Sequence, residues 1–187
     1  TILEEACNAI THLIASLFFL SLGLFYSSAI SSTIYSLIFS SMFFSSFLYH
    51  SQTKQKNLFR HVDQFFIYVV IGASGLLVPS HVHDYHVILI LSMLGLSAIH
   101  HVLRCVLDIP EGFAVPIFYL LNGLLSGYFI MIANSKNTEM LYLSLASYLV
   151  GFLFYVRDHI RYFHVTWHIM CSMGAYFMYC HLVSNLP

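Results

Sequence analysis

Long apolar runs separated by short polar breaks dominate the pattern of this chain. Seven runs can be distinguished, and each is close to the roughly 20 residues that a helix needs to cross a bilayer. They are Ala9 to Ile30, Ser32 to Tyr49, Val62 to Val78, His86 to Leu103, Phe113 to Ala133, Met140 to Val156 and Phe163 to Val183. Only a serine cluster separates the first two runs. The pattern predicts an all-α bundle of seven transmembrane helices.

Composition supports a membrane location and one domain. Of the residues, 59% are hydrophobic and 8% are charged, whereas soluble domains carry about 25% charged residues. No linker or repeat interrupts the chain, which predicts one transmembrane domain over residues 1–187. Glu4 and Glu5 stand where a signal peptide would be basic, so we expect the first helix to be retained. The scattered basic residues exclude the clustered basic face of a nucleic-acid-binding protein.

The basic residues predict the orientation of the bundle. With seven helices, alternate loops lie on opposite sides of the membrane, and Lys and Arg are enriched in the cytoplasmic loops. Lys136 alone lies on the side opposite the N-terminus. The loops on the N-terminal side contain Lys54, Lys56, Arg60, Arg104, Arg157 and Arg161. We therefore predict a cytoplasmic N-terminus and an outer C-terminus.

Three histidines are predicted to meet on the cytoplasmic side. His50 ends the second run, and His164 and His168 open the seventh. Four residues make just over one helical turn, so His164 and His168 share a face about 6 Å apart along the axis. Neutral imidazole is a good zinc ligand, and three protein nitrogens plus a water are typical of an open catalytic site. We predict that His50, His164 and His168 bind zinc.

Asp63 and Ser46 complete the predicted site as its candidate catalytic residues. Asp63 begins the third run on the same side, and Ser46 precedes His50 by one turn. We expect Asp63 to hydrogen-bond a ligand histidine or a water, and Ser46 to orient a ligand or substrate oxygen. Two alternatives stay open. The histidine pair of the seventh run could be solvated at the headgroup level, and Asp63 could simply occupy a helix N-terminus favoured by the helix dipole.

The other histidines and the cysteines give weaker patterns. His100 and His101 are adjacent and cannot share a helix face, so we expect interfacial residues instead of joint ligands. A polar cluster between the third and fourth runs predicts a solvated turn; it comprises His81, His83, Asp84 and His86. The four cysteines show no Cys-x-x-Cys spacing, and we expect neither disulfides nor a thiolate metal site.

Three motifs occur in order along the chain. They read Glu-x-x-Asn-x-x-Thr-His, then Ser-x-x-x-His followed by Arg-x-x-Asp-x-x-x-Ile-Tyr, and finally His-x-x-x-His. Their residues are Glu5, Asn8, Thr11 and His12, then Ser46, His50, Arg60, Asp63, Ile67 and Tyr68, and lastly His164 and His168. Together they resemble the signatures of the hemolysin-III family, the bacterial branch of the progestin and adipoQ receptor family. The fourth to sixth runs carry no matching motif.

The resemblance implies a seven-helix protein of the bacterial inner membrane. Zinc would be bound on the cytoplasmic side by His50, His164 and His168, with Asp63 and Ser46 nearby. The wider superfamily includes alkaline ceramidases, so the implied activity is hydrolysis of a membrane lipid amide or ester. Zinc would activate water, Asp63 would accept or orient its proton, and Ser46 would help to hold the oxyanion.

Two other functions stay open. The protein could be a zinc-stabilised sensor or receptor that influences membrane lipid homeostasis without catalysis, because the same ligands could simply tie helices together. A cytolysin fits less well, since a pore needs polar stripes along its helices and the runs here are apolar almost all round.

Overall fold

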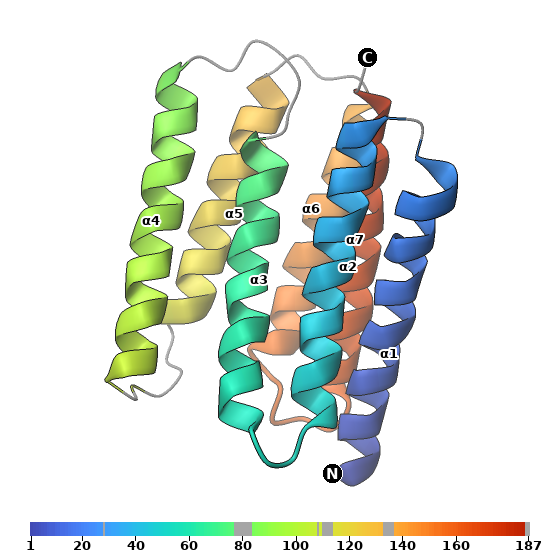
Figure 1. Cartoon of the computed structure of the whole chain (residues 1–187), viewed down its shortest axis with the longest axis vertical. Coiled ribbons are helices and arrows are strands. Elements are labelled where there is room, and N and C mark those ends of the chain that lie inside the picture. Colours follow the sequence, from blue (N-terminus) through green and yellow to red (C-terminus); the bar gives the residue numbers. More distant parts are fainter. Residues whose placement is uncertain (28, 77–83, 108, 110–113, 133–136, 186–187) are drawn as a thin grey trace.

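The computed structural model has seven long α-helices that run up and down beside one another (Figure 1). The structure describes residues 1–27, 29–76, 84–107, 109, 114–132 and 137–185. The helices are α1 (Ile2–Ser21), α2 (Ile30–Ser51), α3 (Lys56–Leu76), α4 (Asp84–Val106), α5 (Ala114–Ile132), α6 (Thr138–Tyr155) and α7 (Phe163–Ser184). A π-helical turn, η1 (Leu22–Tyr26), follows α1. The described residues contain no strand, so the all-α prediction is confirmed.

Each predicted apolar run corresponds to one helix, but α1 and α3 begin more than one turn earlier than predicted, and the first run ends before Ile30, which opens α2. The helix α1 starts at Ile2, where the Thr1 side chain accepts a hydrogen bond from the Glu4 N–H at 3.3 Å and so caps the first turn. The helix α3 starts at Lys56. Its first two turns are largely polar, and an apolar run does not detect polar helical turns.

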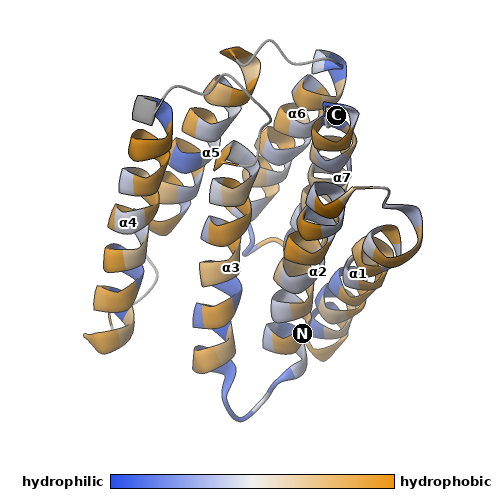
Figure 2. Cartoon of the chain, turned by 45° about the horizontal axis from the view of Figure 1, so that its top comes forward, coloured by the Kyte–Doolittle hydropathy of each residue, from blue (hydrophilic) through white to orange (hydrophobic). Residues whose placement is uncertain are grey.

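The helices have the character of a membrane protein. Five helical segments are long and apolar enough to cross a membrane: Ile2–Tyr26, Ile30–Ser51, His86–Val106, Ala114–Ile132 and Thr138–Tyr155. Large apolar side chains such as Ile14, Ile88 and Leu124 are exposed on the outer faces, as expected for contact with lipid. Figure 2 shows hydrophobic residues along the helices and hydrophilic residues in the turn between α2 and α3.

The helix α7 lies among α1, α2 and α6, whereas α4 lies at the edge of the bundle against α3 and α5 (Figure 1). An aromatic core joins α1, α2 and α7. The ring centroid of Phe19 lies 5.1 Å from that of Phe39, 5.6 Å from that of Phe43 and 6.1 Å from that of Tyr179. This core fixes the three helices that carry most of the candidate site.

Small and polar residues let the helices approach closely. Between α1 and α2, the Ser16 and Ser40 hydroxyls each donate to the main-chain oxygen of the other residue at 3.0 Å. Such interhelical hydrogen bonds fix helix register in membrane proteins. On α6, a Cβ added at Gly151 would lie 2.8 Å from atoms of Trp167 and Met170. Gly151 therefore lets α6 pack directly against the start of α7.

The N-terminal end of the bundle gathers the polar connections. The turn between α2 and α3, the end of α4 and the connection between α6 and α7 all lie at the end marked N in Figure 1, with the six basic residues named above. Lys136, His81, His83 and the Asp84 side chain lie outside the described residues. His86 is described and differs from the predicted solvated turn, because it is buried with its ring centroid 4.4 Å from that of Phe129.

Candidate metal centre

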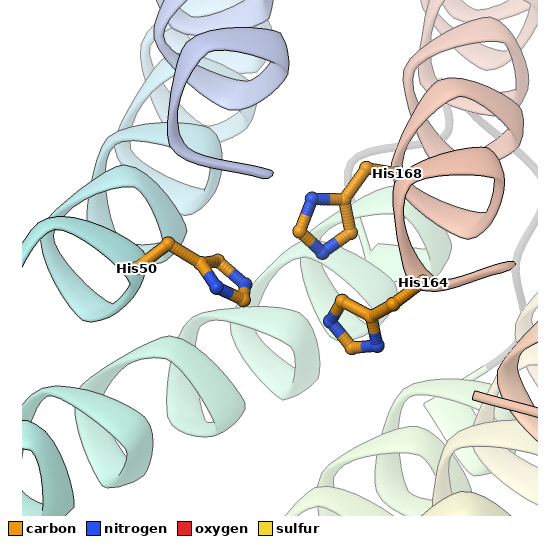
Figure 3. A group of neighbouring side chains, drawn as sticks. All are labelled: His50, His164 and His168. Carbon is orange, nitrogen blue, oxygen red and sulfur yellow. The ribbon is translucent and has the colours of Figure 1, made fainter. Parts of the chain in front are cut away.

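The rings of His50, His164 and His168 converge at the N-terminal end of the bundle (Figure 3). Each histidine offers one ring nitrogen, and these three nitrogens lie within 4.8 Å of one another. Ring centroids are 4.6 Å apart for His164 and His168, 4.8 Å for His50 and His168, and 5.4 Å for His50 and His164. We refer to this group as the three-histidine site.

Helix ends place these side chains as the sequence predicts. His50 lies in the last turn of α2, which ends at Ser51, and His164 follows the first residue of α7. His168 is only 2% exposed and His50 only 8%. The alternative of a histidine pair solvated at the headgroup level is therefore wrong for His168, because its ring faces the interior of the bundle.

The first turn of α1 orients His50. The Oε2 atom of Glu5 lies 3.1 Å from Nδ1 of His50 and accepts a hydrogen bond of 2.8 Å from Nζ of Lys56. A carboxylate only accepts hydrogen bonds, so Nδ1 carries the proton and Nε2 keeps its lone pair for a metal. A carboxylate behind a histidine ligand is the usual way in which proteins fix the ring of that ligand.

Glu4 fixes the position of the start of α7. Its Oε1 atom accepts a hydrogen bond of 2.7 Å from the main-chain N–H of Tyr162. Tyr162 precedes α7 in the left-handed conformation, with φ 66°, which is uncommon for a residue other than glycine. The contact holds the residue from which α7 begins, and so holds His164 and His168 relative to α1.

His12 supports the site from behind His168. The two rings are stacked, with centroids 3.7 Å apart and an angle of 16° between their planes. His12 is 6% exposed, and neither ring nitrogen has a hydrogen-bond partner in the part of the chain that the structure describes. Unpaired buried polar atoms are rare in proteins. A water or a polar group that enters the site would supply the missing partner.

The first motif contains Glu5, Asn8 and His12, whose roles the sequence alone does not assign. The structure shows that all three belong to one face of α1 beside the site, since the spacings of three and four residues repeat the helical period. Asn8 is 2% exposed, and its Oδ1 atom has no hydrogen-bond partner among the described residues. The helical spacing of these polar residues within an apolar helix indicates that they share one face of that helix.

Ser46 and Asp63 lie on the helices around the site. Ser46 is buried one turn before His50 on α2. Asp63 lies two turns into α3 and not at its start, so the helix-dipole explanation is wrong: the first turn of α3 contains no acidic residue. Asp63 does not belong to the group of ligand atoms that lie within 4.8 Å of one another. The catalytic roles of both residues stay predictions.

A second group of possible ligands lies between α3 and α4. His61, His101 and Cys105 each offer one atom, and these atoms also lie within 4.8 Å of one another. The prediction of an interfacial His101 is wrong, because its side chain is 6% exposed and its ring packs against that of His61 on α3. The prediction that no cysteine binds a metal stays a prediction. The earlier start of α3 brings His61 onto a helix beside α4.

The donor set of the three-histidine site fits zinc. Three imidazoles suit zinc and related transition metals, whereas magnesium and calcium favour oxygen ligands. Three ligands also leave one tetrahedral position for another group. Comparison with known proteins adds no further assignment: no protein-family model matches the chain, and no curated protein matches it. The interpretation therefore depends on the geometry of the site.

Proposed function

We propose that this protein is a zinc-dependent hydrolase of the hemolysin-III type that acts on an amide or ester bond of a membrane lipid. The observation that carries the proposal is the convergence of three imidazole nitrogens within 4.8 Å, with Glu5 fixing the tautomer of one of them. An open three-histidine site is the arrangement of catalytic zinc, whereas structural zinc sites have four protein ligands.

His50, His164 and His168 hold the metal in this proposal. When bound, zinc supplies a Lewis acid that polarises a carbonyl and lowers the pKa of water. Asp63 is the candidate proton acceptor, and Ser46 is the candidate donor to the developing oxyanion. His12 has two ring nitrogens free of hydrogen bonds within the described structure, so we assign it contact with a polar group of the substrate or with water.

We further propose that all seven helices span the bilayer, with the N-terminus in the cytoplasm. The helices α3 and α7 are not among the five segments that are long and apolar enough to cross a membrane. The polar residues Arg60, His61 and Asp63 of α3, and His164 and His168 of α7, lower the hydropathy of these two helices. The gathering of six basic residues at the N-terminal end of the bundle supports this orientation. In a bacterium the membrane would be the inner membrane.

The location of the site supports a lipid substrate. His168 and His12 are buried among helices whose outer faces are apolar, and this setting supports a substrate that approaches from the membrane or its interface. A lipid presents its amide or ester bond near the headgroup level, while its chains remain in the apolar layer. The three-histidine site lies at the end of the bundle, where such a bond would be.

The direct test is release of fatty acid by the purified protein. Zinc-loaded protein in detergent or lipid nanodiscs is incubated with a panel of ceramides and phospholipids, and free fatty acid is measured by mass spectrometry. We expect release by the wild type and none by Asp63→Asn, with His159→Ala as a matched control because His159 is an exposed histidine in the connection before α7. Full zinc content without release from any substrate would contradict the proposal.

A non-catalytic sensor is the second candidate, and one observation favours it. Glu4 and Glu5 already connect α1 with α2, α3 and the start of α7, so a metal in the same layer would add one more tie among these helices. In that case zinc would raise the unfolding temperature of the wild type while every lipid of the panel remained intact.

A further inference from the structure

The geometry between α3 and α4 points to a site that the proposed hydrolase does not use. His101 and Cys105 are four residues apart on α4 and therefore lie on one face of that helix. His61 reaches them from the second turn of α3. The ring centroids of His61 and His101 are 5.4 Å apart, with 79° between the ring planes. One possible ligand atom from each residue lies within 4.8 Å of the other two.

The surroundings of this group favour metal binding over an ordinary packed contact. His101 is 6% exposed, and its Nδ1 atom is buried with no hydrogen-bond partner among the described residues. A buried imidazole nitrogen without a partner costs free energy unless something binds it. The rings of Phe65 and Tyr68 lie 6.3 Å from that of His101, measured between centroids.

Cys105 is different, because it is exposed and its thiol is free. The thiolate is the form of cysteine that binds metals, and the thiol proton leaves when the metal binds. The three possible ligands therefore combine a buried imidazole, a half-buried imidazole and an accessible sulfur. The accessible sulfur also gives an ion an entry path from the surface of the bundle.

We propose that His61, His101 and Cys105 form a second metal site that binds a transition metal ion of the zinc or copper(I) class. Two imidazoles and a thiolate select such ions, because thiolate is a soft ligand and magnesium and calcium bind oxygen. The site is separate from the three-histidine site: its ligands come from α3 and α4, whereas those of the three-histidine site come from α2 and α7.

The neighbouring Arg104 makes the thiolate essential. Its guanidinium is buried and donates a hydrogen bond of 3.0 Å from Nη1 to Oε1 of Gln64. Arg104 directly precedes Cys105 in the chain, so its positive charge opposes a cation at the site. The negative thiolate offsets this repulsion, and a serine in its place would not. We therefore expect loss of Cys105 to lower the affinity for the metal more than loss of a neutral ligand, His61 or His101, does.

Cobalt(II) distinguishes this site from the three-histidine site. Ligation by a thiolate gives cobalt(II) a sulfur-to-metal charge-transfer absorption in the near ultraviolet, and the three-histidine site contains no sulfur. The whole chain in detergent is titrated with Co²⁺ alone and followed by absorption. We expect the band in the wild type and in His168→Ala. We also expect it in the control Cys7→Ser, because Cys7 belongs to neither group of possible ligands.

The variants of the second site give the decisive results. The band should disappear in Cys105→Ser, which alters an exposed side chain and should fold normally. In His61→Ala and His101→Ala, the cobalt concentration needed for half of the signal should rise at least about tenfold. Absence of the band in the wild type would overturn the proposal. So would an undiminished titration in both histidine variants, because it would mean that cobalt binds an exposed thiol alone.

Discussion

The two groups of possible ligands lie at the same end of the bundle but have different surroundings. The three-histidine site is covered by α1, which supplies a carboxylate behind His50 and a stacked ring against His168. The group between α3 and α4 has a buried arginine beside it and a sulfur exposed at its edge. Three donors within 4.8 Å occur in both. The two groups therefore differ in the residues that surround the possible ligands, and these residues determine how tightly each group binds a metal.

This difference predicts unequal affinities. Oriented ligands lose less conformational freedom when a metal binds, and the Glu5 carboxylate makes His50 more basic. Arg104 has the opposite influence on the second group, because its charge repels a cation. We therefore expect the three-histidine site to bind zinc more tightly than the second site. Metal affinity at the second site should depend mainly on the soft thiolate ligand.

The largest expected effect comes from His168→Ala. Zinc bound to the native state at about 100 times its Kd stabilises a protein by about 2.7 kcal/mol. The variant should lose most of this gain at the three-histidine site, because the most buried ligand is gone. Thermal unfolding with and without zinc measures the change, with His159→Ala as the exposed-histidine control. An equal zinc-induced rise in unfolding temperature in His168→Ala would mean that the ion binds elsewhere.

Glu5→Gln tests the carboxylate directly. The amide keeps the size of the side chain but removes its charge, so His50 loses its charged partner. Removal of such a partner typically costs about 10–100-fold in metal affinity, and we expect that loss at the three-histidine site alone. Competition with a fluorescent zinc chelator gives the affinity. Glu139→Gln, at the start of α6 near the opposite end of the bundle, should bind zinc like the wild type.

Gly151→Ala tests whether the packing of α6 against α7 positions the site. The added methyl group would lie 2.8 Å from atoms of Trp167 and Met170, so α7 must shift near His168. Overpacking of this kind costs about 1–3 kcal/mol, which chemical unfolding in detergent can measure. Gly123→Ala is the matched control, because a Cβ there meets no atom within 4 Å. Equal stability of the two variants would contradict the close packing described above.

Ser40→Ala is expected to have the smallest effect. It removes the hydrogen bonds that the Ser40 hydroxyl makes with Ser16 and so loosens the register of α1, the helix that carries Glu5 and His12. Interhelical hydrogen bonds in membranes contribute about 0.6 kcal/mol on average. Ser92→Ala is the control, because the Ser92 hydroxyl bonds to Ile88 of its own helix. A larger loss of stability in the control would show that α1 is held by other contacts.

Hydrophobic patterning predicted the number and order of the helices, because each apolar run is long enough to indicate a helix without knowledge of its tertiary contacts. It did not predict the polar starts of helices. The first two turns of α3 contain Lys56 and Arg60 and are no more apolar than a loop. A search for apolar runs therefore places the start of α3 too late.

The candidate site could be predicted in part, where its residues lie at the ends of apolar runs. His164 and His168 share a turn, and His50 ends a run, so their common depth follows from the pattern. The roles of Glu5 and Lys56 depend on how α1 packs against α2 and α3, since their contact joins residues 51 positions apart. His61 could not be grouped with His101 and Cys105 until the true start of α3 and its contact with α4 were known.

The most direct test of the central claim is the metal content of the purified protein. Inductively coupled plasma mass spectrometry should find zinc in the wild type and in His159→Ala. In His50→Ala and His164→Ala it should find one zinc fewer per chain, whatever the second site holds. Unchanged zinc content in both variants would contradict the claim that these histidines form a metal centre.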